Sequence, residues 1–179
     1  MNALKPNRGA TTLIVATGIL LGACTFLAAK ILNPPPVDPL DVEFWDLLDT
    51  QAAVLELENL EGTGQVSNAQ FAGEPYLLIF ADPDCRACET IYPHLLRASQ
   101  VQGVNVLLIA SGDRQAMRDK VEEHSFSFPV AFDSLLTANE PFAVNAFPTS
   151  VLVDAEGKIA KAATGDQGAV AVIGIAGGA

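Results

Sequence analysis

The most informative stretch of this chain is Tyr76-Leu77-Leu78-Ile79-Phe80-Ala81-Asp82-Pro83-Asp84-Cys85-Arg86-Ala87-Cys88. Its first six residues form an apolar run of the kind found in buried strands. A turn that contains proline follows, and apolar residues then recur at helical spacing. Cys85 is therefore expected at the start of a helix, where unpaired backbone N–H groups and the helix dipole stabilise an anion. Because a thiolate is the attacking species in disulfide exchange, the pattern predicts a redox-active pair.

Other roles for the cysteine pair fit less well. A structural zinc site takes about four ligands, whereas the chain holds 3 Cys and 2 His without ligand spacing. A permanent disulfide between Cys85 and Cys88 would close a loop too short to add much stability. An inert buried pair does not fit a turn that opens a helix. We expect no metal, and no cofactor other than the Cys85–Cys88 disulfide itself.

A second informative element lies well downstream of the cysteines. The residues Ala146-Phe147-Pro148-Thr149-Ser150 lead into the apolar run Val151-Leu152-Val153. A proline is tolerated at the mouth of a strand, because the N–H that it lacks would lie at the first position of the strand. From the residues alone, Pro148 simply opens a strand.

Taken together, these elements resemble the thioredoxin superfamily: the strand-turn-helix with its C-x-x-C, Pro93 after the cysteines, and the Phe-Pro-Thr before a strand. The resemblance implies a thioredoxin-like α/β fold with a central mixed sheet flanked by helices. It implies that Pro148 is cis, a conformation that costs little only before proline. It also implies that this loop packs on the cysteine pair and presents backbone to a substrate. The substrate contacts expected are Phe147, Thr149, Arg86 and Ala87.

Further stretches are similar to the membrane-tethered, extracytoplasmic TlpA/ResA/MauD-like group of thiol-disulfide proteins. These stretches are residues 57–62, 71–80, 128–130 and 151–159, and the resemblance covers roughly residues 50–165. We expect Cys85 to attack a substrate disulfide and Cys88 to resolve the mixed disulfide, with Pro148 completing the catalytic set. Residues 107–113 look most like MauD-type proteins, which implies maturation of one disulfide-rich enzyme. Reduction of apocytochrome c is the alternative role.

Two acidic groups of related proteins are absent from this chain. Many thioredoxin-like reductants keep a buried carboxylate beneath the resolving cysteine, and the matching residue here is Ile79. A related branch places a glutamate three residues after the second cysteine, where this chain has Ile91. Proton transfer from Cys88 would then use water or an exposed acid such as Glu89. Arg86 either favours the Cys85 thiolate or is merely solvated.

The N-terminal segment carries targeting signals. Lys5 and Arg8 precede an uncharged run over residues 11–29, and positive residues stay in the cytoplasm, so the rest of the chain should be exported. The run can span a bilayer as an uncleaved anchor, which we favour. Alternatively, Leu21-Gly22-Ala23-Cys24 resembles a lipobox, in which Cys24 would be lipidated. Either outcome places the domain at the bacterial cytoplasmic membrane, on the extracytoplasmic side.

Four segments follow from composition. They are an anchor or lipoprotein signal (1–32), a Pro-rich acidic linker (33–50), a thioredoxin-like domain (51–165) and a Gly/Ala-rich apolar tail (166–179). The tail either forms a short apolar helix over the sheet or leaves that face for a partner. Trp45 is expected to be an ordinary core anchor. The net charge of −11 argues against a nucleic-acid partner.

Periodicity predicts the secondary structure of the domain. Strands are expected over residues 54–57, 76–81, 104–110, 149–154 and 158–163, with a short extended piece around residue 129. Helices are expected over residues 42–48, 86–102, 113–123 and 135–144. Asp113 is a plausible N-cap for the third of these helices.

The expected function is disulfide exchange with protein thiol or disulfide substrates, reset by a membrane electron donor or acceptor. Two alternatives remain open. One is a redox-inactive thioredoxin-like binding or assembly module, which the missing carboxylates favour. The other is a Cu(I)-handling protein, because two thiolates suit Cu(I); it would need His124 as a further ligand.

Overall fold

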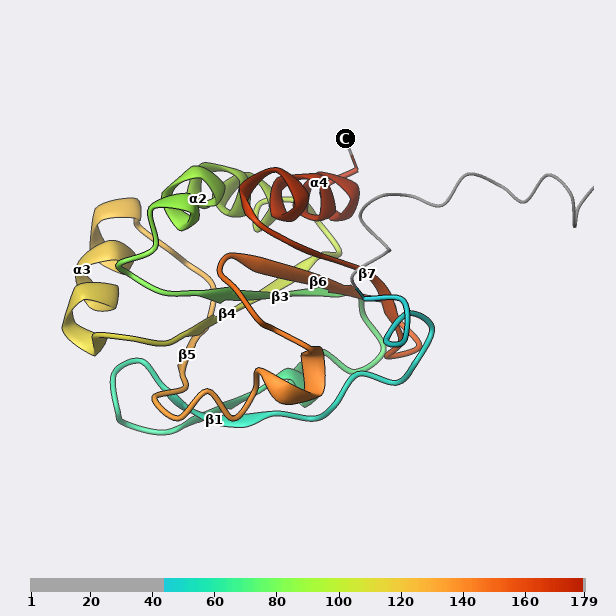
Figure 1. Cartoon of the computed structure of the whole chain (residues 1–179), viewed down its shortest axis with the longest axis horizontal. Coiled ribbons are helices and arrows are strands. Elements are labelled where there is room, and N and C mark those ends of the chain that lie inside the picture. The colour runs from blue at the N-terminus through green and yellow to red at the C-terminus, as the bar shows by residue number, and fades with distance from the viewer. Residues whose placement is uncertain (1–43, 179) are drawn as a thin grey trace, which may run out of the picture. The chain divides into compact units, whose positions relative to one another are not determined.

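The computed structural model describes residues 44–178 of the chain (Figure 1). The expected anchor, the lipobox with Cys24 and the first part of the Pro-rich linker lie outside the described residues. Within residues 44–178, no helix is both long enough and apolar enough to cross a membrane.

A seven-stranded mixed sheet forms the centre of the domain. In spatial order its strands are β2 (Gln65–Ser67), β1 (Glu56–Asn59), β5 (Val130–Phe132), β4 (Asn105–Ala110), β3 (Tyr76–Ala81), β6 (Thr149–Val153) and β7 (Ile159–Thr164). β3 lies near the middle, parallel to β4 and antiparallel to β6. This arrangement confirms the mixed, thioredoxin-like sheet that the sequence indicates.

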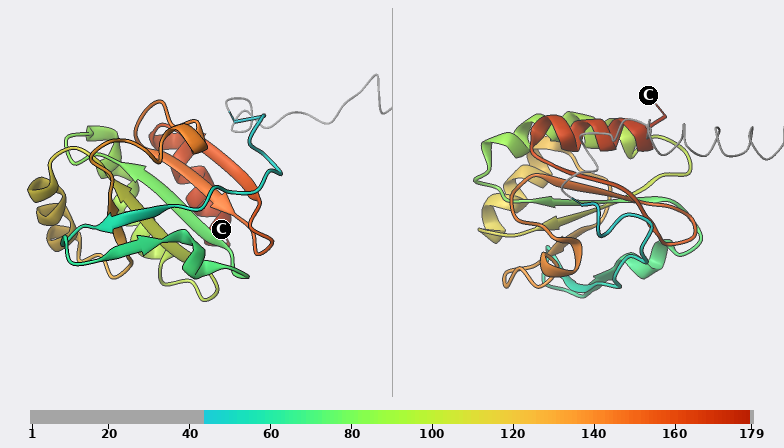
Figure 2. Two further views of the ribbon diagram at one scale, coloured as in Figure 1. Left: turned by 90° about the horizontal axis from the view of Figure 1, so that it is seen from below. Right: turned by 45° about the vertical axis from the view of Figure 1, so that its right-hand side comes forward.

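Helices cover both faces of the sheet. They are α2 (Arg86–Ala98), α3 (Arg114–His124) and α4 (Asp166–Ala176), with two short 3₁₀ helices, η1 (Asn68–Phe71) and η2 (Glu140–Phe142). Figures 1 and 2 show α2 and α4 side by side on one face, with η2 on the other. The Asp113 carboxylate accepts the Ala116 N–H at 2.7 Å and caps α3, as predicted.

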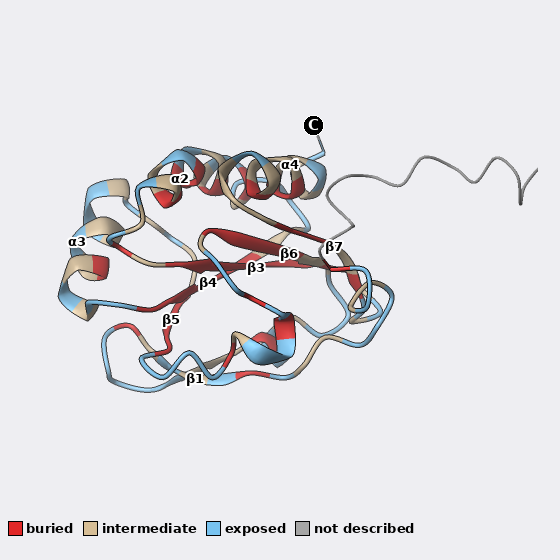
Figure 3. Cartoon of the chain, in the orientation of Figure 1, coloured by how far each residue is buried: buried red, intermediate tan, exposed pale blue. Residues whose placement is uncertain are grey.

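β3 is buried on both faces, which explains why its sequence is apolar throughout rather than alternating. Leu77 and Ile79 face the cluster that contains Cys88, whereas Leu78 and Phe80 face the cluster on the opposite side of the sheet. Figure 3 shows the buried residues concentrated in the central strands. The strand that carries the cysteine turn is therefore held firmly by packing from both sides.

The C-terminal residues form α4, which packs against α2, β6 and β7. Ala169, Val172 and Ile173 are buried in the same core cluster as Cys88. Of the two outcomes predicted for this tail, the structure takes the short apolar helix that covers the sheet.

The expected helix over residues 135–144 is wrong, since only η2 forms there. The Asp133 carboxylate accepts the Ala138 N–H at 2.7 Å and the Thr137 hydroxyl at 3.0 Å, which stabilises a turn in place of helical hydrogen bonds. Leu136 has a φ of 57° and Ala143 a φ of 50°, and such left-handed residues interrupt a helix.

The prediction for Trp45 is also wrong, because its side chain is 65% exposed. The neighbouring Phe44 is 1% exposed and occupies the core position instead. Residues 44–49 form turns rather than a helix, and the first strand, β1, begins at Glu56 rather than at residue 54. β2 was not predicted, because a strand of 3 residues carries too little periodicity to detect.

Candidate active site

The turn between β3 and α2 places Cys85 at the N-cap of α2. The Cys85 N–H donates to the Asp82 carbonyl at 3.1 Å, which closes the turn. The Cys85 sulfur accepts the N–H of Cys88 at 3.3 Å, so it satisfies one of the unpaired donors that open every helix. The sulfur thus takes the position usually filled by a serine or aspartate oxygen. The positive end of the helix dipole favours negative charge at this atom.

Cys88 lies one turn into α2 and is fully buried, whereas Cys85 is partly exposed. Both are free thiols. Burial raises the pKa of Cys88, because it strips water from the thiolate, and the hydrogen bond with the Cys85 side chain raises that pKa further. A hydrogen bond from the Asp82 backbone acts in the opposite direction and is outweighed. Cys88 therefore holds its proton, and Cys85 is the thiol that an incoming partner can reach.

The loop before β6 meets the cysteine pair. The Cys85 thiol donates to the Phe147 carbonyl at 3.4 Å, although the two residues are far apart in sequence. The peptide bond between Phe147 and Pro148 is cis, as the resemblance implied. Pro148 is buried and Phe147 is half-buried. The structure thus brings together four residues that the sequence selected: Cys85, Cys88, Phe147 and Pro148.

The other residues expected to contact a substrate differ in how far they are exposed. Arg86 is exposed and makes no ion pair with any residue between 44 and 178, which matches a solvated side chain. Ala87 is half-buried beside the pair. The Thr149 side chain is fully buried, and its hydroxyl bonds to the Ala146 carbonyl at 2.8 Å and to the Thr164 hydroxyl at 2.9 Å. Thr149 therefore supports the loop from inside and does not offer its side chain to a substrate.

The surroundings of Cys88 are apolar on the side of the core. Ile79 and Ile91 are both fully buried in the same cluster as Cys88. Glu89 points to α3, where its carboxylate lies 2.5 Å from the Lys120 ammonium and 3.4 Å from His124 Nε2. The acid suggested from sequence as a proton acceptor is therefore already engaged by a cation.

No site role is assigned to Asp82 from the sequence, but two hydrogen bonds hold its carboxylate beside the cysteine turn. One oxygen accepts the Asp84 N–H at 2.9 Å, and the other lies 3.4 Å from the Ser111 hydroxyl. The signal that marks this position is its place in the turn between the buried strand and Cys85. The side chain is half-buried beside the pair.

No group of three or more His, Cys, Asp or Glu that could hold a metal ion is found within residues 44–178. His124, the further copper ligand considered from the sequence, packs its ring against Tyr92 at a centroid distance of 4.9 Å.

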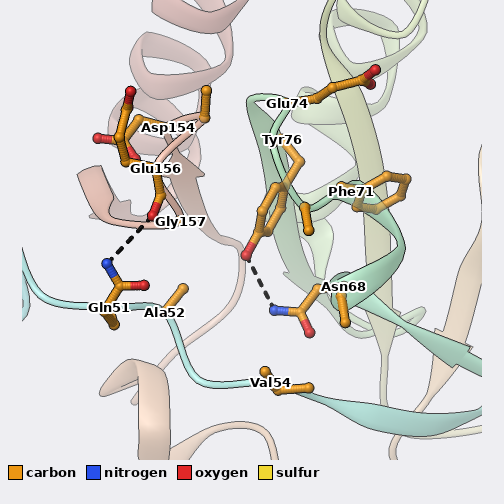
Figure 4. Close-up of a pocket in the computed structure, with 14 residues that line it drawn as sticks. Gln51, Ala52, Val54, Asn68, Phe71, Glu74, Tyr76, Asp154, Glu156 and Gly157 are labelled. Atoms are coloured by element: carbon orange, nitrogen blue, oxygen red, sulfur yellow. Dashed lines mark hydrogen bonds between the residues drawn. The ribbon is translucent and has the colours of Figure 1, made fainter.

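A separate pocket of about 240 Å³ lies around the start of β3, at the opposite end of that strand from the cysteines (Figure 4). Its polar groups are largely paired with one another. The Asn68 amide donates to the Tyr76 hydroxyl at 3.2 Å, and the Gln51 amide donates to the Glu156 carbonyl at 3.3 Å. No cysteine lines this pocket, so it is distinct from the thiol site.

Comparison with known proteins gives consistent results. A model of the AhpC/TSA family matches residues 48–162. The thiol-disulfide oxidoreductase ResA of Bacillus subtilis strain 168 is 26% identical over 163 residues, which cover 86% of this chain and 85% of ResA. The methylamine utilization protein MauD of Paracoccus denitrificans is 28% identical over 95 residues, which cover 53% of this chain and 47% of MauD. The crystal structure of a secreted Mycobacterium tuberculosis disulfide oxidoreductase, homologous to DsbE of E. coli, matches with a TM-score of 0.55 and 25% identity, covering 59% of this chain and 79% of that protein.

Proposed function

This chain belongs to the AhpC/TSA family and is a thiol-disulfide oxidoreductase of the thioredoxin type, and we propose that it exchanges disulfides with protein partners through Cys85 and Cys88. The observation that carries the proposal is the 3.4 Å contact between the Cys85 thiol and the Phe147 carbonyl. It puts a partly exposed thiol next to a loop whose backbone can lie against a substrate chain. A fully buried second thiol stands one helical turn away.

The chemistry follows from the different exposure of the two thiols. The Cys85 thiolate attacks one sulfur of a substrate disulfide, and the other substrate sulfur leaves as a thiolate that takes up a proton. Cys88 then loses its proton and attacks the Cys85 sulfur, which releases the second substrate thiol. The substrate disulfide gains two electrons, and Cys85 and Cys88 lose them as they form a disulfide. The same steps in reverse would oxidise a dithiol substrate.

The N-terminal segment would attach the domain to a membrane. The uncharged run over residues 11–29, preceded by Lys5 and Arg8, would hold the domain at the bacterial cytoplasmic membrane with the cysteines on the extracytoplasmic side. A membrane electron donor or acceptor would then reset the pair. The mass of the intact mature protein separates the two forms of attachment. An uncleaved anchor retains residues 1–23, whereas a lipoprotein begins at a modified Cys24.

The substrate class is a protein of the same compartment. The likeness of residues 107–113 to MauD-type proteins favours the maturation of one disulfide-rich enzyme over the reduction of apocytochrome c. This choice is testable by supplying either class of substrate to the reduced protein and measuring which disulfide is reduced faster.

A trapping experiment tests the function itself. Cys88→Ser removes the thiol that resolves the mixed disulfide, so a reduced Cys88→Ser protein mixed with insulin should accumulate a covalent complex that dithiothreitol reverses. Cys85→Ser is the matched control, because it leaves only the buried Cys88 thiol of the pair. With Cys24 replaced by alanine in both variants, Cys85→Ser should form no complex. Failure of Cys88→Ser to form a complex would refute the proposed exchange. Equal trapping by both variants would refute the assignment of Cys85 as the attacking thiol.

A further inference from the structure

The second step of the exchange needs a proton acceptor. A thiol attacks a disulfide only as a thiolate, and Cys88 is buried with its pKa raised. The titratable groups that face Cys88 are Cys85 and Asp82 from the turn and Tyr92 from its own helix. Beyond Tyr92 lie Glu89 of α2 and, from α3, His124 and Lys120.

We propose that the carboxylate of Asp82 accepts the proton of Cys88 when Cys88 attacks the mixed disulfide, an inference that rests on the proposed function. Asp82 is then the general base of the resolving step. Three observations lead to this assignment: the position of Asp82 in the fold, the contacts that hold its carboxylate, and the fact that Tyr92 and Glu89 are less able to accept the proton.

The register of the sheet brings Asp82 to the right place. Ala81 of β3 lies opposite Ala110 of β4 in parallel pairing, so the residues that follow the two strands meet at one edge of the sheet. Asp82 lies there against the turn that holds the pair: its carbonyl accepts the Cys85 N–H at 3.1 Å, and its carboxylate is 3.4 Å from the Ser111 hydroxyl. A general base acts within hydrogen-bond reach of the proton or through one water.

The local backbone leaves space for the Asp82 carboxylate and orients it. Gly112 has a φ of +74°, and a Cβ atom built there would lie 2.6 Å from Asp82 Oδ2. Only glycine leaves room for the carboxylate in this position. The other oxygen, Oδ1, accepts the Asp84 N–H at 2.9 Å, so the side chain is oriented from two sides.

The carboxylate is also chemically available. No Lys, Arg or His among residues 44–178 forms an ion pair with Asp82.

The competing groups are less suited to this role. Burial raises the pKa of Tyr92, so its phenol remains protonated and cannot take a proton. The Glu89 carboxylate is engaged by Lys120 at 2.5 Å. Glu89 also directly follows Cys88 in α2, which turns its side chain about 100° around the helix axis from that of Cys88.

The step balances without any further reactant. Asp82 takes the proton from the Cys88 thiol, and the Cys88 sulfur forms a bond to the Cys85 sulfur while the bond from Cys85 to the substrate sulfur breaks. The substrate sulfur leaves as a thiolate and takes up the proton that Asp82 holds. This transfer returns Asp82 to the carboxylate form.

Asp82→Asn tests the proposal, because asparagine can keep the hydrogen bond from Asp84 but cannot accept the proton. The full chain, carrying Cys24→Ala so that Cys85 and Cys88 are its only thiols, is reduced in mild detergent, freed of reductant and mixed with oxidised glutathione. The reaction is then quenched with acid at set times. Mass spectrometry separates the mixed disulfide from the Cys85–Cys88 disulfide. Cys88→Ser, which stops after the first step, supplies the rate of that step alone. Asp84→Asn is the matched control, and Glu89→Gln tests the competing acceptor.

We expect Asp82→Asn to form the mixed disulfide at close to the normal rate but to resolve it about 100-fold more slowly, within the range typical of lost general base catalysis. The remaining rate should rise about tenfold per pH unit, as expected when hydroxide replaces the side chain. Asp84→Asn and Glu89→Gln should resolve the mixed disulfide normally.

The direction in which the rate of the resolving step changes distinguishes a general base from a mere negative charge. The negative charge of Asp82 also raises the pKa of Cys88, so removing that charge alone would speed the resolving step. Resolution by Asp82→Asn at an unchanged or higher rate would overturn the proposal, as would a slow step confined to Glu89→Gln. A wild-type protein that forms no mixed disulfide at all would instead refute the proposed function.

Discussion

Replacing Gly112 with alanine should destabilise the domain through one side chain, that of Asp82. The added Cβ would lie 2.6 Å from Asp82 Oδ2 and 3.0 Å from its Cγ, so the carboxylate must move. Gly73→Ala is the matched control, because Gly73 has a similar φ of +88° but nothing within 4 Å of the position of a Cβ.

The magnitude follows from two contributions. Alanine in the left-handed region costs about 1–2 kcal/mol, and this cost applies to both variants. Displacing Asp82 breaks the hydrogen bond between its carboxylate and the Asp84 N–H, which adds about 1.5–3 kcal/mol because the acceptor is charged. We therefore expect a loss of about 1–2 kcal/mol for Gly73→Ala and about 2.5–5 kcal/mol for Gly112→Ala.

Urea unfolding of the reduced full chain, followed by far-UV circular dichroism, measures both values. Fluorescence is a poor reporter here, since the chain has 1 Trp and that residue, Trp45, is 65% exposed. A double-mutant cycle isolates the contact. In an Asp82→Ala background, the cost of Gly112→Ala should shrink to the backbone contribution, with a coupling energy of about 1.5–3 kcal/mol. Equal costs in the two backgrounds would show that the Asp82 carboxylate is not the cause of the lost stability, as would equal costs for Gly112→Ala and Gly73→Ala.

Two further predictions concern packing and pH. Phe44→Ala should lower the free energy of unfolding by about 3–5 kcal/mol, because that side chain is 1% exposed, whereas Trp45→Ala should change it by no more than about 0.5 kcal/mol. Urea unfolding of the two variants measures both values. A larger loss for Trp45→Ala than for Phe44→Ala would contradict the observed packing. Burial raises the pKa of Cys88, so the reduced folded chain keeps a proton that the unfolded chain loses above about pH 8.5. The contribution of Cys88 to the free energy of unfolding is therefore fully present below that pH, and the free energy falls above it by up to about 1.4 kcal/mol per pH unit. Cys88→Ser should flatten this part of the curve, and an unchanged slope would show that the loss has another origin.

The parts of the fold that could be predicted are those in which neighbouring residues carry the information. The buried run 76–81, the turn and the helix that starts after Cys85 follow from a few adjacent residues, and all three are found as predicted. The cis peptide before Pro148 was likewise implied by a local resemblance and is confirmed.

The predictions from sequence are wrong where a contact with a distant residue, or a competing local contact, determines the structure. Residues 135–144 contain apolar residues at helical spacing, but the Asp133 carboxylate stabilises a turn at their start. Phe44 and Trp45 are adjacent aromatic residues, and sequence alone does not say which of the two enters the core. The contact between Asp82 and Gly112 joins residues that follow two different strands, and it exists because β3 and β4 pair in a particular register.

Cys85 and Cys88 are expected to form a reversible redox couple. The most direct test is equilibration of a Cys24→Ala full-length protein, which retains only these two thiols, in glutathione or dithiothreitol buffers, followed by thiol trapping and mass measurement. We expect one reversible transition in which both thiols are gained or lost together, with a tenfold change in the equilibrium ratio for about 30 mV, as expected for two electrons. A pair that never forms a disulfide, or that cannot be reduced while the protein is folded, would show that Cys85 and Cys88 do not exchange disulfides.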